Sequence, residues 1–196
     1  VRTIAPLVQT GHGVWVPDMP GFGDSALPPG CSDADHLPPW LQQGLQQLLA
    51  DRAVALVGFS FGGLVAGCLA AAQPARVQRL VLVGAPALSR QVLPPLPLRE
   101  WQHLPAGPEQ DAVHRHNLGV LMLAHTRSLD DLAVQLHAHN VRRDRMRRRR
   151  LMLTDTLLRL LPGLACPVHG IWGEHDVLYH NRLEVVRDAL PQAPGF

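Results

Sequence analysis

The sequence lacks lysine altogether and has a single tyrosine and only three cysteines, so all 18 basic residues are arginine. The missing lysine is interpreted as coding bias and carries no chemistry. Cys31, Cys68 and Cys166 are odd in number, lie far apart and form no Cys-x-x-Cys pair. This pattern excludes a disulfide framework and a structural zinc site, and it predicts a reducing, cytoplasmic location.

Net charge and long apolar runs are also scarce. The formal net charge is only +2, so no global field attracts the chain to nucleic acid or to an anionic membrane. The apolar runs Gly63–Ala72 and Leu80–Leu88 are shorter than the roughly 20 residues that a membrane-spanning helix needs. We therefore expect neither membrane insertion nor a nucleic-acid partner.

The apolar content is sufficient for one folded domain. The chain has 196 residues, of which 46% are hydrophobic and 17% charged, and this composition excludes an intrinsically disordered chain. Short apolar runs alternate with helical patterns, which is typical of an α/β domain whose parallel strands are covered on both faces. The expected strands are Gly13–Pro17, Ala53–Gly58, Arg79–Gly84 and Pro167–Gly173, and the expected helices are Pro38–Ala50, a helix ending near Ala72, and Asn181–Leu190.

Between residues 86 and 162 the pattern changes to helices alone, expected around Asp111–Ala124, Leu129–His139 and Arg142–Leu161. We interpret this helical block as an insertion into a core formed by residues 1–85 and 163–196. Its run RRDRMRRRR (Arg142–Arg150) contains no aromatic residue that could stack on bases. The run is therefore predicted to be a solvated helix face, with steering of anionic substrates or contact with a membrane surface as alternatives.

The strongest chemical signal is Gly58-Phe59-Ser60-Phe61-Gly62, a G-x-S-x-G at the junction of a buried strand and a small-residue helix. A serine on such a turn has a strained backbone, and the glycines two residues before and after it are expected to avoid collisions with neighbouring chain. The turn lifts the serine hydroxyl above the sheet edge. There the helix N-terminus favours developing negative charge.

At these residues the chain resembles the α/β-hydrolase family. The segment VPDMPGFGDS (Val16–Ser25) is similar to the family's D-x-x-G-x-G-x-S turn, RLVLVGAPAL to the strand after the elbow helix, and IWGEHDVL to the strand and loop that present the catalytic acid. The family has a helical cap at the position of residues 86–162. The resemblance implies an α/β fold with a mostly parallel sheet of the α/β-hydrolase type and an inserted helical cap.

The resemblance also implies roles for individual residues. Ser60 is similar to the nucleophile, the backbone N–H of Phe61 to an oxyanion-hole donor, and Asp176 to the acid that orients the catalytic histidine. Glu174 is the competing acid. Asp18, with the glycines that follow it at positions 21 and 23, is interpreted as shaping a tight loop near the site.

Two parts of the family's pattern are absent from this sequence. The family's histidine follows one further strand, whereas this sequence stops at APGF. In the family a strand and a His-Gly oxyanion loop come before the strand matched by Gly13–Pro17, and the missing strand lies between that strand and the one matched by Ala53–Gly58. We therefore expect an internal part of a longer hydrolase, incomplete at both ends, that shows little or no turnover by itself.

The eleven histidines offer weak substitutes for the missing base. His175 and His180 flank the acid loop, but a neighbour on the same loop rarely both binds the acid and faces the serine. Gly11-His12-Gly13 imitates the oxyanion loop without room for the helix that follows it in the family.

Metal and cofactor sites are not expected. His114-x-His116 and His137-x-His139 have a spacing that places each pair on different helix faces, so they are interpreted as solvated residues. Gly21-Phe22-Gly23 lacks the third glycine of a dinucleotide fingerprint.

The function expected from these residues is that of a serine hydrolase acting on a small, partly hydrophobic carbonyl substrate. An ester, or the carbon–carbon bond of a diketone, is cleaved by Ser-His-Asp nucleophilic catalysis, with the histidine outside this chain. A serine nucleophile argues against epoxide hydrolases and haloalkane dehalogenases, which use aspartate. One alternative is a non-catalytic binding module that retains the fold. A weaker alternative is a nucleic-acid binder that uses the arginine run, and no oligomeric state is predicted.

Overall fold

The computed structural model describes residues 3–31, 33–90, 95–146, 148–193 and 195. Leu93 and Pro94, in the proline-rich entry to the helical block, and Arg147, in the arginine run, lie outside these residues. The helices are α1 (Ile4–Gln9), α2 (Leu37–Leu49), α3 (Phe61–Ala72), α4 (Pro108–Leu121), α5 (Asp131–Arg142), α6 (Thr156–Leu160) and α7 (Glu184–Ala189), and the strands are β1 (Val54–Phe59), β2 (Val77–Val83) and β3 (Val168–Ile171). The described residues also form five short 3-10 turns: Ala34–His36, Thr126–Ser128, Leu151–Leu153, Leu161–Gly163 and Leu190–Gln192.

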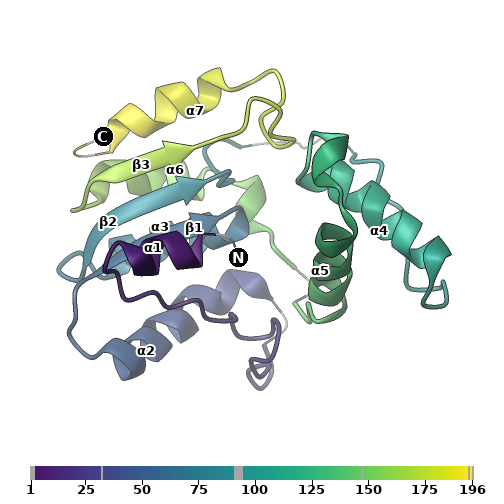
Figure 1. Ribbon diagram of the computed structural model, residues 1–196. Helices are drawn as coiled ribbons and strands as arrows, with labels where there is room; N and C mark the ends of the chain where they lie inside the picture. Colours follow the sequence, from purple (N-terminus) through teal and green to yellow (C-terminus); the bar gives the residue numbers. More distant parts are fainter. Residues whose placement is uncertain (1–2, 32, 91–94, 147, 194, 196) are drawn as a thin grey trace.

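The three strands form one parallel sheet in the order β1-β2-β3 (Figure 1). Leu56 pairs with Leu80, and Leu80 pairs with Val168, so apolar residues of all three strands line up on one face. Three of the four expected strands form, and their ends lie within one or two residues of the expected ends. The α/β fold with a parallel sheet is confirmed.

Helix α3 packs on β1 and β2 because its residues are small. A Cβ atom on Gly63 would lie 2.7 Å from the Ala85 Cβ atom, and one on Gly67 would lie 2.5 Å from Leu157 Cδ1. The second contact belongs to α6, which packs on the outer side of α3. Leu157 and Leu161 are fully buried there. The main core therefore lies between the sheet and this layer of helices.

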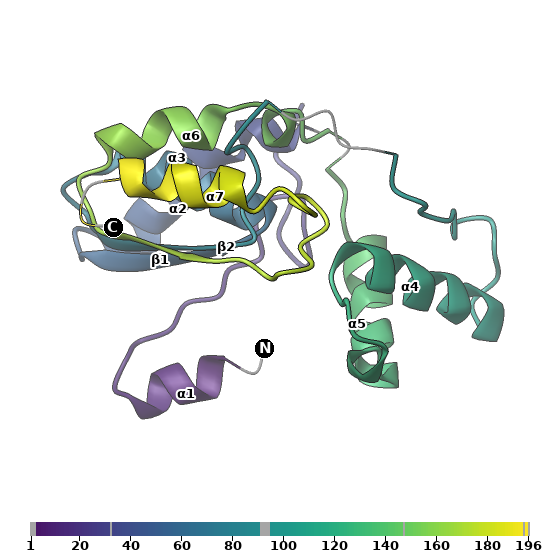
Figure 2. The ribbon, with the colours of Figure 1, turned by 90° about the horizontal axis from the view of Figure 1, so that it is seen from above.

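The described residues cover only one face of the sheet, and this differs from the expectation of cover on both faces. Successive strand residues point to opposite faces. On β1, Val57 is 66% and Phe59 56% exposed, and on β3 Ile171 is 58% exposed. Figure 2 shows α2, α3, α6 and α7 on one side of the sheet and α1 on the other. Helix α1 buries none of its residues, so the second face stays open to solvent.

The predicted strand at residues 13–17 is wrong. This segment pairs with no described strand, and Trp15 and Val16 are 59% and 62% exposed. A strand needs a neighbour to satisfy its backbone N–H and C=O groups. The order of strands in the family places another strand between this segment and β1, and no described strand takes that position.

Within the helical block, α4 and α5 pack on each other beyond the carboxyl ends of the strands (Figure 1). The expected helix from Arg142 to Leu161 forms only near its end, as α6, because α5 ends at Arg142 and residues 143–146 and 148–150, which we call the strap, are not helical. Backbone groups of the strap form hydrogen bonds with distant parts of the chain. Arg145 N–H donates to Gly21 O, and Arg148 O accepts from Ala34 N–H. The domain boundaries stay a prediction.

Among the described residues, no helix combines the length and the apolar character needed to cross a membrane.

Candidate functional site

Ser60 lies at the junction of β1 and α3, with backbone angles φ 51° and ψ −125°. Positive φ is costly for a residue with a side chain, so a tight local network must hold it. The Ser60 N–H donates to Val83 O over 2.8 Å, and Ser60 O accepts from Gly63 N–H over 2.8 Å. The backbone thus turns sharply where the strand ends and leaves Ser60 half-buried.

The glycines around this turn differ in their importance. A Cβ atom on Gly58 would lie 2.5 Å from Gly63 Cα and would also collide with Gly62 O. A Cβ atom on Gly62 would meet nothing within 4 Å. The expected collision is therefore real at Gly58 and wrong at Gly62. On the helix, Gly63 is the glycine that has no room for a side chain, because it packs against Ala85.

Phe61 is the first residue of α3, and its side chain is only 8% exposed. The first N–H groups of a helix have no partner within the helix. The backbone amide of Phe61 therefore belongs to a turn that can donate to an anion beside Ser60. The Arg149 guanidinium lies 5.9 Å from the centre of the Phe61 ring.

Asp176 lies in the turn that follows β3. Its Oδ1 atom accepts from Leu178 N–H over 2.9 Å, and a Cβ atom on Gly84 would lie 3.0 Å from its Oδ2 atom. Burial raises the pKa of the Asp176 carboxyl, while hydrogen bonds from the amides of Leu178 and Tyr179 act in the opposite direction. The carboxyl is thus partly desolvated and fixed in orientation.

The ends of the three strands bring these residues to one edge of the sheet. Val83 O accepts from Ser60, and the next residue, Gly84, donates its N–H to Ile171 O over 2.9 Å. Asp176 packs against the same Gly84. Behind this edge the fully buried Tyr179 donates its hydroxyl to Ala85 O over 3.0 Å and fixes the acid turn. Ser60 and Asp176 therefore flank the carboxyl end of β2.

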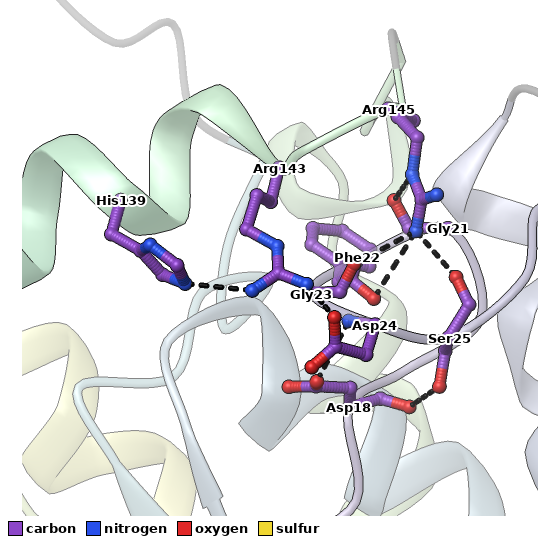
Figure 3. A network of polar contacts seen from close by, with 9 residues as sticks. All are labelled: Asp18, Gly21, Phe22, Gly23, Asp24, Ser25, His139, Arg143 and Arg145. Carbon is purple, nitrogen blue, oxygen red and sulfur yellow. Dashed lines mark hydrogen bonds and ion pairs between the residues drawn. The ribbon is translucent and has the colours of Figure 1, made fainter.

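The loop of residues 18–25 is shaped as expected from its sequence. Gly23 has a φ of 49°, and the Asp18 carboxylate occupies the place that a Cβ atom on Gly23 would need. Asp18 Oδ2 accepts from Asp24 N–H over 3.0 Å, and Asp18 O accepts from the Ser25 hydroxyl over 2.6 Å (Figure 3). We call residues 18–25 the glycine loop.

The contacts of strap residues with this loop were not predicted from the sequence. The Arg145 guanidinium donates to carbonyl oxygens of the glycine loop, and the Arg149 guanidinium lies 5.3 Å from the centre of the Phe22 ring. The sequence offered one signal for these contacts, Met146, which is the one apolar residue within the arginine run. In the structure Met146 is only 3% exposed.

All eleven histidines lie among the described residues, and none hydrogen-bonds Ser60 or Asp176. His175 is exposed, and its ring lies 6.3 Å from that of His125. His12, His180 and Glu174 are also exposed.

In each of the two histidine pairs of the helical block, the two side chains lie on different helix faces, as expected. The prediction that both members of each pair are solvated is wrong for one member. His114 and His137 are buried. The described residues hold no group of three or more His, Cys, Asp or Glu side chains arranged to bind a metal.

Parts of the sequence are similar to known proteins. A family model described as alpha/beta hydrolase fold matches residues 1–109. A pimeloyl-[acyl-carrier protein] methyl ester esterase of Aeromonas hydrophila is 34% identical over 82 residues, which are 42% of this chain and 31% of that protein. A 2-hydroxy-6-oxo-2,4-heptadienoate hydrolase of Pseudomonas putida is 34% identical over 114 residues, or 57% of this chain and 40% of that protein. The chain thus matches 31% and 40% of the lengths of these two relatives.

Solved structures show the same fold. A meta-cleavage product hydrolase from Pseudomonas fluorescens superposes with a TM-score of 0.74 at 21% identity, covering 98% of this chain and 73% of that one. A thermophilic esterase from Thermogutta terrifontis superposes with a TM-score of 0.59 at 20% identity, covering 92% and 67%.

Proposed function

Because the chain belongs to the alpha/beta hydrolase fold family, we propose that the whole protein is a serine hydrolase with Ser60 as its nucleophile. The observation that carries the proposal is the backbone of Ser60, held at φ 51° between a strand end and a helix start. Strain of this kind is found at functional sites, where the surroundings maintain it. Asp176 flanks the same strand end and supports the assignment.

The proposed chemistry follows from these positions. Ser60 Oγ attacks a substrate carbonyl, and the Phe61 N–H donates to the oxyanion that forms. Asp176 orients the histidine that takes the serine proton, and this histidine is not one of the eleven in the sequence. A single oxyanion-hole donor is worth about 2.7–4 kcal/mol of transition-state stabilisation.

We propose a small, partly hydrophobic carbonyl compound as the substrate. Relatives named as a methyl ester esterase and as a dienoate hydrolase support a carboxylic ester or the carbon–carbon bond of a diketone. We propose no cofactor, because this chemistry needs only the serine, its base and its acid. Three free thiols, at Cys31, Cys68 and Cys166, support a cytoplasmic location.

Labelling with a fluorophosphonate probe tests the nucleophile in the full-length gene product. The probe is expected to label the wild type, to fail on Ser60→Ala, and to react more slowly with Asp176→Asn. Ser128→Ala, which changes an exposed serine of the helical block, is the matched control and is expected to label normally. Undiminished labelling of Ser60→Ala would contradict the proposal.

The alternative is a binding module that retains the fold without catalysis. It is favoured by one observation, that no histidine hydrogen-bonds Asp176. Loss of a triad base has lowered kcat about a millionfold elsewhere, so we expect the 196-residue chain alone to hydrolyse p-nitrophenyl esters poorly. Absence of both labelling and ester hydrolysis in the full-length product supports the binding module. Robust Ser60-dependent hydrolysis by the 196-residue chain contradicts the proposed need for a further histidine.

A further inference from the structure

We propose that Arg145 is a positioning residue for the site, because its guanidinium latches the glycine loop beside the nucleophile turn. This inference rests on the proposed role of Ser60. It concerns a residue of the arginine run, which lies more than 80 positions beyond the nucleophile in the sequence.

The first argument is the number of loop carbonyls that meet this one side chain. Arg145 Nε donates to Gly21 O over 3.3 Å, and Nη2 donates to Phe22 O over 3.4 Å and to Gly23 O over 3.1 Å. Nη2 also donates to the carbonyl oxygen of Ser25 (Figure 3). The backbone N–H of Arg145 adds a bond of 3.0 Å to Gly21 O. A single residue thus binds four carbonyl groups of the loop.

The second argument is that, among the described residues, Gly21 O, Gly23 O and Ser25 O accept only from Arg145, whereas Phe22 O also accepts from Ser25 N–H within the loop. Positive φ at Gly21 and Gly23 turns the backbone so that its carbonyl oxygens converge. Converging carbonyl dipoles repel one another unless a donor group lies between them. Arginine suits this position because its planar guanidinium carries several fixed donors, whereas the lysine ammonium is a compact point charge.

The third argument connects the loop to the nucleophile. The Arg149 guanidinium lies 5.3 Å from the centre of the Phe22 ring and 5.9 Å from that of the Phe61 ring. Phe22 belongs to the glycine loop, and Phe61 directly follows Ser60 and carries the proposed oxyanion donor. A shift of the loop therefore changes the packing around that donor.

Arg143 provides the comparison within the same strap. It forms an ion pair with Asp24, whose side chain is 84% exposed, and it contacts the exposed His139 (Figure 3). Exposed ion pairs contribute little to stability. The latch is therefore assigned to Arg145 and not to the positive charge of the strap as a whole.

The experiment compares Arg145→Ala and Arg145→Lys with Arg143→Ala in the full-length gene product. Hydrogen exchange of the loop amides measures the latch, and the rate of fluorophosphonate labelling at Ser60 measures the site. Arg145→Lys keeps the charge without the fork of donors, so it tests the latch even where the alanine variant fails to fold. Exchange in β2, away from the loop, shows whether a variant is folded.

In Arg145→Ala we expect loop exchange to accelerate about tenfold or more, since several hydrogen bonds to a charged group are lost. Labelling is expected to slow by about 10- to 100-fold, as for a misplaced reacting group. The loop exchange rate and the labelling rate of Arg145→Lys should lie between those of the wild type and Arg145→Ala. Both rates in Arg143→Ala should equal those of the wild type. Added methylguanidinium should restore both loop protection and labelling in Arg145→Ala, which a general loss of stability would not allow.

Unchanged loop exchange in both Arg145 variants would overturn the latch. Faster exchange with an unchanged labelling rate would overturn the positioning role. A wild-type protein that the probe does not label would overturn the proposed nucleophile, while the exchange data would still decide whether the latch exists.

Discussion

Ser60 illustrates how a single residue in this chain is held in an unfavourable conformation. A residue with a side chain at positive φ costs about 1–3 kcal/mol. The bonds from Ser60 N–H to Val83 O and from Gly63 N–H to Ser60 O, each 2.8 Å long, oppose this cost. The turn also needs space for its backbone, and Gly58 provides it.

We expect Gly58→Ala to destabilise the fold by about 1–3 kcal/mol, as overpacked sites do. The reason is that the new methyl group meets backbone atoms of Gly62 and Gly63, which cannot move without unwinding the start of α3. The measurement is the free energy of unfolding in urea, followed by circular dichroism.

Gly62→Ala is the matched control for this substitution. A Cβ atom there meets nothing within 4 Å, and alanine favours a helix over glycine by up to about 1 kcal/mol. Its stability is therefore expected to equal or exceed that of the wild type. Equal losses in the two variants would show that glycine at position 58 has no special packing role.

At the scale of elements, the α4–α5 pair encloses an unusual polar core. His114 is fully buried, and neither of its ring nitrogens has a hydrogen-bond partner among the described residues. Its ring lies 5.0 Å from that of Trp101 and 5.7 Å from that of His137. Burial lowers the pKa of His114, and the nearby charge of Arg142 lowers it further, while Asp111 opposes the change. Burial and the neighbouring His114 also lower the pKa of His137.

We expect the stability of the chain to fall as the pH drops below 6.5, the ordinary pKa of histidine. The unfolded chain binds protons at His114 more readily than the folded chain, so protons favour unfolding. The contribution of neutral His114 to the free energy of unfolding is fully present above pH 6.5. It is lost as the pH falls toward the lower pKa of His114 in the folded state. Between pH 7.5 and 5, the free energy of unfolding should therefore fall less in His114→Phe than in the wild type.

His103→Phe, at an exposed position of the same helical block, is the matched control for the loss of an imidazole ring. The measurement is urea unfolding at a series of pH values. The same pH dependence in the wild type and in His114→Phe would show that His114 is not responsible.

The sequence predicted elements well where a local pattern determines them. The apolar run before Ser60 and the small residues after it specify a strand, a turn and a helix, and all three formed as expected. The arginine run was predicted wrongly because its structure depends on distant partners. Arg150 donates its side chain to Asp33 over 2.8 Å and its backbone N–H to Asp35 over 3.0 Å. No helical spacing in the run reveals acceptors that lie more than 100 residues away.

At the scale of the molecule, the open sheet face is the feature with the clearest physical consequence. Val57, Phe59 and Ile171 expose apolar side chains together on this face. Contiguous apolar patches of this kind attract other apolar surfaces. Sequence reasoning expected both faces to be covered because apolar strands are usually buried on both sides. Strand composition alone does not specify which segments supply that cover.

We expect the 196-residue chain to bind the dye 8-anilinonaphthalene-1-sulfonate at this face. The double variant Val57→Thr, Ile171→Thr should lower the dye fluorescence roughly twofold, since threonine keeps the strand preference and reduces apolar area. Leu48→Gln, which removes an exposed apolar residue on α2 away from the sheet, is the control and should change it little. If the double variant gave the same dye fluorescence as the wild type, the dye would bind at another surface.

The latch formed by Arg145 also has a consequence for protein synthesis. Arg145 follows its partner Gly21 by 124 residues. At 5–20 residues per second, the ribosome needs about 6–25 s to add that length of chain. During this interval the nascent chain carries an early loop whose carbonyl groups are bonded to water. A chaperone or a protease that meets the emerging polypeptide therefore encounters this loop before its arginine has been translated.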